Sequence, residues 1–387
     1  MIKSKILNWL DERFDLKKIQ GPLEYQIKKP LPKNIGWFHT LGSMSLFLFI
    51  SQILTGILLL IYYRPTVDEA FESIKFIMTK PYMGWLYRNI HAWGANLMIM
   101  IVFLHMLRTF VTGSFKKPRE MTWINGVVLF FLMLIFGFTG YLLPWNQLAY
   151  WATTVGTEIA GAVPLIGEPI KTFLRGGPAV GSETMSRFFV IHVIILPWIV
   201  FALVGIHLFL VRYQGIATMK PADEERKIPP GEGIPFFPHH VMKEGVIFFI
   251  LLGILVTLSI AAPFELGEKA DPLVTPEGIK PEWYFLPMYH VLKYFSKLLG
   301  IFIVGLAPLL LFFWPFLDRS KERHPFKRPV SMAIGVLTIL SLLIFGMLGY
   351  LSETKQTFLG KIYHFNIYGV PHKIKTGENL SEIRGGL

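Results

Sequence analysis

The chain has 387 residues, of which 52% are apolar or aromatic and 17% are charged, and its net charge is +12. This composition is too hydrophobic for a soluble domain of this length, so the basic excess indicates membrane topology in preference to nucleic-acid binding. The sequence contains no cysteine, which excludes disulfides, thiolate metal sites, iron–sulfur clusters held by this chain and haem attached through thioethers.

The first 36 residues form a separate N-terminal segment. They have neither a continuous apolar core nor a small-residue cleavage site, so they do not read as a secretory signal peptide. Apolar residues alternate there with lysine and aspartate, which predicts an amphipathic helix on the cytoplasmic membrane surface. The apolar residues are Ile6, Leu7, Leu10, Phe14 and Leu16.

Seven long runs without Asp, Glu, Lys or Arg follow. They are Trp37–Tyr63, Asn89–Leu107, Met121–Thr157, Phe188–Val211, Gly245–Phe264, Leu298–Leu317 and Val330–Ser352. Each is long enough to cross a hydrocarbon core as a helix of about 20 residues. The third run exceeds one span, and Pro144 with Trp145 should end its helix and begin a shorter element in the interface. The sequence predicts an all-α integral membrane protein with seven transmembrane helices.

Two polar stretches divide the chain. The Pro-rich segment Lys220–His240 separates a four-helix part, residues 37–215, from a three-helix part, residues 216–352. A polar tail, residues 353–387, follows. Within the second part, the non-helical loop Glu265–Lys280 leads into Pro281–His290, and long loops with aromatic and acidic residues at membrane depth are usually functional.

Basic residues set the expected orientation. Phe115–Arg119, Arg212–Lys227 and Asp318–Arg328 are rich in Lys and Arg and fall on one side of a seven-helix chain. The positive-inside rule makes that side cytoplasmic. The N-terminus is then cytoplasmic and the C-terminus lies outside.

Four histidines occur in matched register on two of the predicted helices. His91 and His105 are fourteen residues apart, and His192 and His207 are fifteen apart. Four helical turns take about 14.4 residues, so each pair lies near one face, with a rise of roughly 21–22 Å. Both helices run in the same direction, so His91 should lie level with His192 and His105 level with His207.

Two interpretations of these histidines compete. A single intramembrane histidine is often a hydrogen-bonded packing residue, although polar groups within the membrane often have a functional role. A bare zinc or iron site needs three or more ligands close together, which two separated pairs do not offer. Haem iron needs only two axial ligands, so the pattern predicts two bis-histidine haems in a four-helix bundle that transfer electrons and do not activate oxygen.

Glycines and arginines support this prediction. The glycine pairs Gly42 with Gly56 and Gly126 with Gly140 repeat the fourteen-residue spacing and could admit a flat haem, although glycine also serves ordinary helix packing. Arginines near the helix ends could pair with haem propionates, or could only snorkel or set topology. The arginines are Arg88, Arg119 and Arg212.

With these residues and the PEWY motif at 281–284, the chain resembles cytochrome b of the quinol-oxidising, Rieske-containing bc complexes. Residues 1–215 resemble cytochrome b6, through YYRPTVDEAFESIKFIM, FKKPREMTWINGV, GYLLPWNQLAYWA, LRGGPAVG and the fifteen-residue histidine spacing. The remainder resembles the partner subunit IV, with three helices and PEWYFLP. Here the two parts form one polypeptide without an eighth helix, which points to a bacterial plasma membrane. Thr40 occupies the position where cytochrome b6 attaches an extra haem through cysteine.

The resemblance implies a quinol:cytochrome c oxidoreductase subunit with two noncovalent b-type haems. Quinol would be oxidised near the outer surface, one electron passing to a Rieske iron–sulfur protein and on to a c-type cytochrome. The other would cross through the haem of His91 and His192 and then that of His105 and His207 to an inner quinone site, building proton-motive force. A homodimer, lipid contacts and, from the bacterial setting, menaquinone are also expected.

The same resemblance assigns roles at the two quinone sites. Glu282 would accept the quinol proton, because burial raises a carboxylate's pKa toward that of a general base. Tyr284 and the Tyr150–Val155 stretch would shape the pocket, together with Pro281 and Trp283. Arg212 and Asp223 are weaker candidates at the inner site.

Two other functions remain open from the sequence. A dihaem membrane anchor of a dehydrogenase would not need PEWY in a long outer loop. A haem-free transporter with proton-relaying histidines often shows repeats and broken helices, and neither is evident. Five of the other histidines are interpreted as ordinary interface or loop residues. They are His39, His239, His240, His290 and His324.

Overall fold

The computed structural model describes residues 2–16, 18, 21, 24, 27–28, 30–33, 35–224, 232–276, 278–358 and 361–373. Within this part of the chain, seven helices are long and apolar enough to cross a membrane, which confirms the predicted number. Their outward faces carry exposed large apolar side chains such as Phe249, Phe302 and Leu343. An exposed surface of this kind suits a lipid environment.

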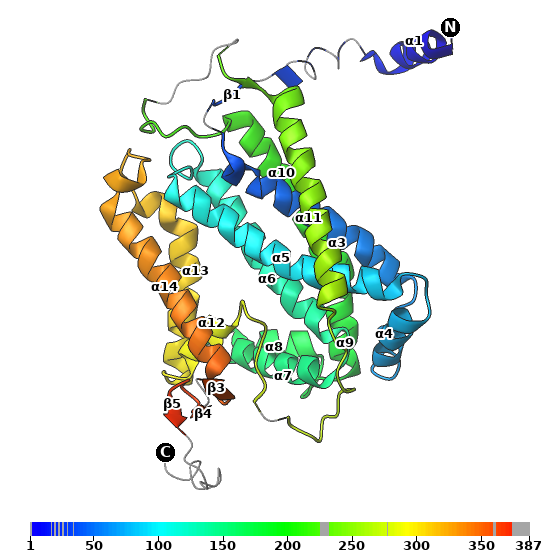
Figure 1. Cartoon of the computed structure of the whole chain (residues 1–387), viewed down its shortest axis with the longest axis vertical. Helices are drawn as coiled ribbons and strands as arrows, with labels where there is room; N and C mark the ends of the chain where they lie inside the picture. The colour runs from blue at the N-terminus through cyan, green and yellow to red at the C-terminus, as the bar shows by residue number, and fades with distance from the viewer. Residues whose placement is uncertain are drawn as a thin grey trace.

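The elements of the first part run in chain order as follows (Figure 1). They are α1 (Ile2–Phe14), β1 (Pro30–Leu31), η1 (Trp37–Thr40), α3 (Leu41–Leu60), α4 (Ala70–Thr79), α5 (Gly84–Val111), α6 (Glu120–Leu142), α7 (Gln147–Gly161), α8 (Gly167–Arg175), α9 (Ser182–Val190), the π-helix η2 (Ile191–Ile195) and α10 (Leu196–Gln214). The helices η1 with α3, α5, α6 and α9 to α10 are the first four membrane-spanning helices.

The second part continues beyond the Pro-rich stretch. Its elements are β2 (Ile234–Pro235), η3 (Phe236–His240), α11 (Val241–Ala261), α12 (Leu286–Leu292), α13 (Lys297–Leu317), η4 (Pro325–Lys327), α14 (Pro329–Leu351), β3 (Lys355–Phe358), β4 (Lys361–Phe365) and β5 (Pro371–Lys373). Strands β3, β4 and β5 form an antiparallel sheet after the last span. The sequence analysis identified a polar tail and did not predict this sheet. Residues 374–387 of the tail lie outside the described residues.

The interface element expected after the third span is present. Helix α6 ends at Leu142, and Trp145 takes a left-handed backbone conformation with φ 51°. Asn146 then caps α7, its side chain accepting a hydrogen bond of 2.8 Å from the Ala149 amide. A side-chain acceptor at this position satisfies one of the free amides of the first helical turn. Helices α4, α8 and α12 are additional short elements that the charge-free runs did not reveal.

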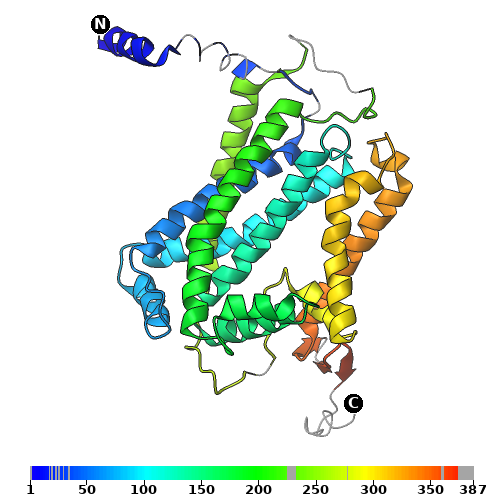
Figure 2. The same cartoon turned by 180° about the vertical axis from the view of Figure 1, so that it is seen from behind.

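Contacts between distant loops define one end of the molecule, which we call the inner end. Strand β1 pairs with β2, the Ala222 amide donates to the Lys321 carbonyl, and Arg323 donates to the Lys117 carbonyl. The N-terminal segment and the three basic loops therefore lie together, as their charge predicted. The opposite, outer end holds α7, α8, α12 and the C-terminal sheet (Figures 1 and 2).

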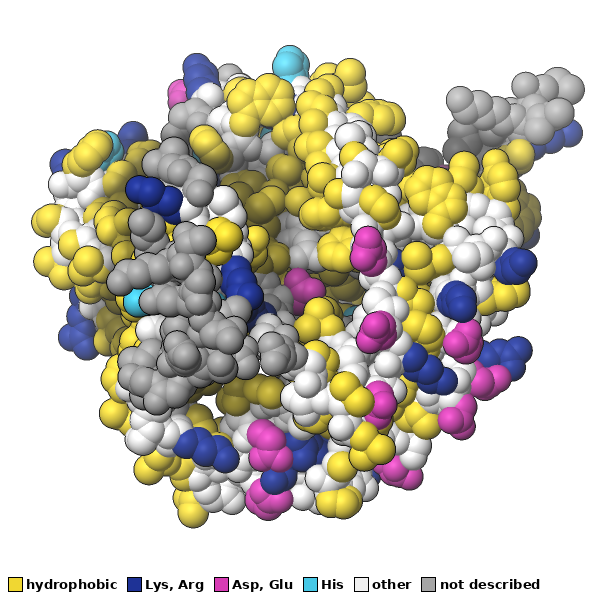
Figure 3. All heavy atoms as spheres, turned by 60° about the horizontal axis from the view of Figure 1, so that its bottom comes forward, with side chains coloured by type: hydrophobic (Ala, Val, Ile, Leu, Met, Phe, Trp, Pro, Cys, Tyr) yellow, Lys and Arg dark blue, Asp and Glu magenta, His cyan; other side chains and the backbone are white. Residues whose placement is uncertain are grey.

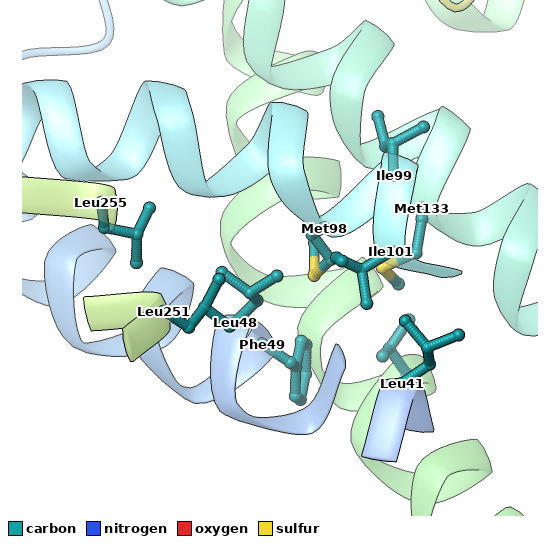
Figure 4. Packing of buried hydrophobic residues seen from close by; sticks show 10 residues of the cluster. Leu41, Leu48, Phe49, Met98, Ile99, Ile101, Met133, Leu251 and Leu255 are labelled. Atoms are coloured by element: carbon teal, nitrogen blue, oxygen red, sulfur yellow. The ribbon is translucent and has the colours of Figure 1, made fainter. Parts of the chain in front are cut away.

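The main hydrophobic core lies between α3, α5, α6, α10 and α11. Leu48 from α3, Met98 from α5 and Leu255 from α11 meet in it with at most 5% of their surfaces exposed (Figure 4). Helix α11 thus packs on the four-helix part, whereas α13 and α14 lie on the other side of the molecule beside α12 (Figure 1). The three long helices of the second part do not form a bundle of their own. They pack against the first part on two sides.

Candidate functional site

The four histidines meet in two facing pairs inside the bundle. The ring centres of His91 and His192 are 6.5 Å apart, and those of His105 and His207 are also 6.5 Å apart. In each pair, one ring comes from α5 and the other from the helix formed by α9, η2 and α10. The depth matching that the spacing predicted is therefore present in the structure.

The separation of the rings fits one shared metal between them. An imidazole nitrogen lies about 2.0–2.1 Å from a bound metal, so two such rings on opposite sides of one ion have centres roughly 6 Å apart. Among the described residues, no group of three or more His, Cys, Asp or Glu side chains could hold a metal ion. Two opposed imidazoles without further protein ligands suit haem iron, whose porphyrin fills the other positions.

A wide helical turn makes the two unequal sequence spacings equivalent. Residues Ile191–Ile195 form a π-helix, in which the Leu196 amide donates to the Ile191 carbonyl. A π-turn takes up one more residue than an α-turn, and such bulges occur frequently at functional sites. The fifteen-residue separation of His192 and His207 can therefore correspond to the same rotation about the helix axis as the fourteen-residue separation of His91 and His105.

Neighbouring helices offer a hydrogen-bond acceptor to three of the four imidazoles. His91 Nδ1 lies 2.9 Å from Thr55 Oγ1, and His192 Nδ1 lies 3.1 Å from Thr139 Oγ1. Both threonine hydroxyls donate to the carbonyl four residues earlier, so their oxygens accept from the imidazole N–H. His207 Nδ1 lies 3.0 Å from Asn125 Oδ1. Donation from Nδ1 leaves the Nε2 lone pair available to a metal.

Sequence reasoning missed these three acceptors, although a signal existed. Thr55, Asn125 and Thr139 immediately precede three of the predicted glycines. The repeat that was noticed in the glycines therefore extends to the residues before them.

Each predicted glycine faces one of the histidines. A Cβ added at Gly140 would lie 2.5 Å from His192 Cε1, and at Gly42 it would lie 3.2 Å from His105 Cε1. At Gly126 the distance to His207 Cε1 would be 3.4 Å, and at Gly56 the distance to His91 Cε1 would be 3.5 Å. The sequence suggested that these glycines make room for a flat haem. In the structure they make room for the imidazole rings themselves, with the least space at Gly140 and the most at Gly56.

The predicted arginines lie near the ends of the bundle and already contact protein groups. Arg88 donates to the Phe264 carbonyl at the outer end. At the inner end, Arg119 donates to the carbonyls of Gln214 and Gly215, and the Arg212 guanidinium lies 4.3 Å from the centre of the Phe236 ring.

Arg108 is a further candidate that the sequence analysis did not single out. It lies three residues after His105 on α5, and its buried Nε has no hydrogen-bond partner among the described residues. A buried guanidinium nitrogen of this kind could donate to an acidic group such as a haem carboxylate.

The PEWY segment forms a turn that leads into α12 at the outer end. The Phe285 amide donates to the Glu282 carbonyl over 2.8 Å, and Trp283 Nε1 donates to Asn96 Oδ1 over 2.7 Å. Tyr284 packs against the main core, and its hydroxyl would lie 2.6 Å from a Cβ on Gly137 of α6. The segment is thus fixed against α5 and α6, one helical turn from Gly140.

Glu282 is half-buried, and burial raises the pKa of its carboxyl. Burial also raises the pKa of the neighbouring Tyr284 phenol, and the Glu282 carboxylate adds to that rise. Both groups therefore favour their neutral forms more than in water. A space-filling view of the outer end shows a hollow whose walls are largely hydrophobic, with acidic and basic side chains on its rim (Figure 3).

Tyr150 lies in a second hydrophobic cluster on α7. Its ring is perpendicular to those of Trp145 and Trp151, at 5.7 and 5.4 Å between centres. Phe138 packs against this cluster and also contacts Phe285 at 6.5 Å between centres. Phe138 therefore contacts both this cluster and Phe285, the residue after the PEWY segment.

The remaining candidates differ in burial. Asp223 is exposed and pairs with Lys321 over 2.9 Å, and such surface pairs have little energetic weight. His290, expected in an interface or loop, is instead fully buried in α12, where its Nε2 lies 3.0 Å from the Tyr294 hydroxyl. His39 Nδ1 accepts from the Gly36 amide, and His240 pairs with Glu244 over 3.2 Å.

Comparison with known proteins decides the family. The sequence profile described as Cytochrome b/b6/petB matches residues 26–215, and the profile described as Cytochrome b(C-terminal)/b6/petD matches residues 269–368. The chain belongs to the cytochrome b family.

Relatives extend this cytochrome b assignment over most of the chain. A "Cytochrome bc complex cytochrome b subunit" of Chlorobaculum thiosulfatiphilum is 41% identical over 88% of this chain and 80% of its own length. The "Cytochrome b" of Rickettsia prowazekii (strain Madrid E) is 37% identical over 89% of this chain and 86% of its own. A solved chain titled "Hyperthermophilic respiratory Complex III" superposes with a TM-score of 0.81 at 36% identity, covering 90% of this chain and 92% of that one. The protein is a multi-pass cytochrome b subunit of a bc-type complex.

Proposed function

We propose that this cytochrome b oxidises quinol at its outer end and carries electrons to an inner quinone site, as part of a bacterial quinol:cytochrome c oxidoreductase. The observation that carries the proposal is the facing of two imidazoles, at 6.5 Å between ring centres, at each of two levels in one bundle. Two levels of ligands provide two redox positions along the membrane normal. Separation of quinol oxidation from quinone reduction across the membrane would build proton-motive force.

We assign His91 with His192 and His105 with His207 as axial ligands of two noncovalent b-type haems. A haem held by these histidines would supply reversible one-electron transfer. Helix α5 and the helix formed by α9, η2 and α10 contribute the ligands. On α3 and α6, Gly42, Gly56, Gly126 and Gly140 provide room for them. The arginines would pair with the haem carboxylates. They are Arg88 at the outer end and Arg108, Arg119 and Arg212 at the inner end.

At the outer end, we assign Glu282 as the group that takes a proton from quinol. A general base works best when its pKa lies near the operating pH, and burial moves the carboxyl of Glu282 in that direction. Pro281 and Trp283 would hold the turn, and the Trp283 bond to Asn96 fixes it against α5. Tyr284 and Tyr150 would shape the hydrophobic pocket from two sides.

At the inner site, the two candidate side chains already contact protein groups. Arg212 is committed to the Phe236 ring and Asp223 to Lys321, so quinone binding would require these side chains to exchange partners. Thr40 is buried, and its hydroxyl donates to the Trp37 carbonyl over 2.6 Å. A hydroxyl in that place cannot attach haem through a thioether.

Membership of a bc-type complex suggests the partners and the location of this chain. The names of the relatives point to a bc complex and to a respiratory complex, so we infer a Rieske iron–sulfur protein and a c-type cytochrome as neighbours, with homodimerisation of the complex. We place the chain in the bacterial plasma membrane, with the basic inner end cytoplasmic by the positive-inside rule, and infer menaquinone as the quinone. Residues 37–215 would form the haem-binding part, and residues 216–352 would form the three-helix part that carries the PEWY segment of the quinol site.

One purification tests the proposal. The intact complex should contain two extractable b-type haems for each copy of this chain, a Rieske protein and a c-type cytochrome, and should reduce cytochrome c with quinol. A complex with two haems but with quinone reduction coupled to a dehydrogenase would indicate the membrane-anchor alternative. A chain without haem would leave the transporter alternative and overturn the proposal.

A further inference from the structure

The residue before each of the four glycines occupies the same structural position. Thr55 precedes Gly56, Asn125 precedes Gly126 and Thr139 precedes Gly140. Each of these polar residues places an oxygen 2.9–3.1 Å from the Nδ1 of the histidine that its glycine faces. One glycine thus admits the imidazole, and the residue before it accepts a hydrogen bond from that ring.

The fourth position breaks the repeat. Leu41 precedes Gly42, and Gly42 faces His105. A leucine side chain has no acceptor, and the buried Nδ1 of His105 has no hydrogen-bond partner among the described residues. Leu41 and Thr55 are fourteen residues apart on α3, so they lie on nearly one face of that helix.

We propose that Thr55, Thr139 and Asn125 are positioning residues that orient three of the haem-ligating imidazoles and raise their electron donation, and that Leu41 withholds this support from the fourth. The proposal rests on the haem ligation assigned above. It concerns residues that do not touch the iron and act through the ligands.

The physical basis is the effect of a hydrogen bond at the far nitrogen of a ligand. An acceptor at Nδ1 fixes the tautomer and ring orientation, and it increases the basicity of Nε2. A more basic ligand stabilises ferric over ferrous iron, because ferric iron carries the greater positive charge. The outer pair, His91 and His192, has two such bonds, whereas the inner pair has one. The two sites therefore differ in a way that the identical bis-histidine ligand sets do not reveal.

The test measures the midpoint potential and the visible band of each haem in the purified complex. Thr55→Val and Thr139→Val keep the side-chain volume and remove the hydroxyl acceptor, although the backbone of Gln52 and Phe136 stays near the two rings. Each variant should raise the potential of the outer haem and leave the inner one unchanged. A hydrogen bond of ordinary strength changes an equilibrium by up to about tenfold, which is about 59 mV for one electron. Thr55→Ser and Thr139→Ser keep the hydroxyl and should restore the original potential.

The inner site offers the reciprocal experiment. Leu41→Thr places a hydroxyl where Thr55 has one, and Leu41→Val is its match in volume without the hydroxyl. The threonine variant should have a lower inner-haem potential than the valine variant. Asn125→Leu should raise the inner-haem potential, since it removes the one hydrogen bond from an imidazole Nδ1 at that site.

Thr109→Val is the control for loss of a nearby hydroxyl. The Thr109 hydroxyl donates to the His105 backbone carbonyl over 2.9 Å, and its removal should leave both potentials unchanged. If a valine variant loses the outer haem and the matching serine variant keeps it, the hydroxyl is needed to hold the histidine in its ligating orientation. That result would also support the positioning role.

Valine variants that keep both haems with unchanged potentials and bands would overturn the inference and leave the haem assignment intact. A wild-type chain without two b-type haems would instead refute the proposed function itself.

Discussion

The Nζ of Lys116 lies 2.6 Å from the Oδ1 of Asp318, and the two side chains are only 3% and 6% exposed. Lys116 belongs to the loop between α5 and α6, whereas Asp318 follows α13. Arg328 and Ser331 also donate to Asp318 Oδ2, over 3.2 and 2.7 Å. This cluster therefore joins the first four helices to the last two at the inner end.

Asp318→Asn should destabilise the protein, because it leaves the charges of Lys116 and Arg328 buried without their carboxylate. Removal of one partner from a buried ion pair costs roughly 3–5 kcal/mol. The thermal unfolding midpoint of the purified protein in detergent should fall clearly. Glu69→Gln is the matched control, since Glu69 pairs with Arg64 at 3.0 Å with both side chains at least half exposed, and such pairs contribute at most about 1 kcal/mol.

The same cluster predicts a pH dependence of stability. Burial would raise the pKa of Asp318, but hydrogen bonds from Lys116, Ser331 and Arg328 outweigh it and hold the pKa below its usual value. A carboxyl with a lowered folded-state pKa stabilises the fold above its unfolded pKa of about 3.9, and this contribution is lost as pH falls through the folded value. The difference between wild type and Asp318→Asn should therefore shrink only below about pH 4. An equal difference at lower pH would show that the carboxylate charge is not the cause.

Replacement of single histidines should remove haems selectively. His105→Leu or His207→Leu should abolish mainly the inner haem, and His91→Leu or His192→Leu mainly the outer, because in the proposed assignment each pair would supply both protein ligands of one haem iron. Haem extraction and redox-resolved spectra of the four variants measure this. Unchanged haem content in all four would rule out the ligand assignment.

Two glycines beside the outer pair should differ in their tolerance of alanine. A Cβ at Gly140 would lie 2.5 Å from His192 Cε1, which forces the ring to move, whereas a Cβ at Gly56 would lie at an ordinary 3.5 Å from His91 Cε1. Gly140→Ala should therefore lower the occupancy of the outer haem, and Gly56→Ala should keep it near wild type. The measurement is haem content per chain, and equal occupancy in the two variants would contradict the geometry.

Glu282→Gln should keep both haems and slow quinol oxidation. Loss of a general base costs about a hundredfold to ten-thousandfold. A carboxylate base with a raised pKa must lose its proton before it can accept one, so wild-type turnover should rise with pH through that pKa, and this rise should disappear in the variant. Steady-state reduction of cytochrome c across pH measures both effects. Wild-type turnover at every pH would indicate that the proton leaves through another group.

Covalently bound haem should be absent from this polypeptide. The bond requires a cysteine sulfur, and the chain has none, with Thr40 at the position in question. A denaturing gel stained for haem peroxidase activity should show no band at the mass of the chain. Noncovalent haem is lost on denaturation, so extractable haem is counted separately and should amount to two per chain. A stained band would contradict the argument directly.

The sequence by itself determined the number of spans, the inner grouping of the basic loops and the two levels of histidines. These properties are local or periodic. Charge-free runs are visible residue by residue, and fourteen or fifteen positions on a helix fix both rise and face. The PEWY motif was visible for the same reason, although its contact with Asn96 was not.

Only the tertiary structure decided which groups meet across helices. The fourteen-residue repeat that includes Thr55, Asn125 and Thr139 does not by itself tell which groups these residues contact. Their contacts with imidazoles on α5 and on the α9 to α10 helix depend on how the helices rotate and pack against one another. The same holds for Lys116 and Asp318, which are separated by 202 positions and are joined by the fold alone. The fifteen-residue separation of His192 and His207 matches the fourteen-residue separation of His91 and His105 because the helix contains a π-turn at Ile191–Ile195.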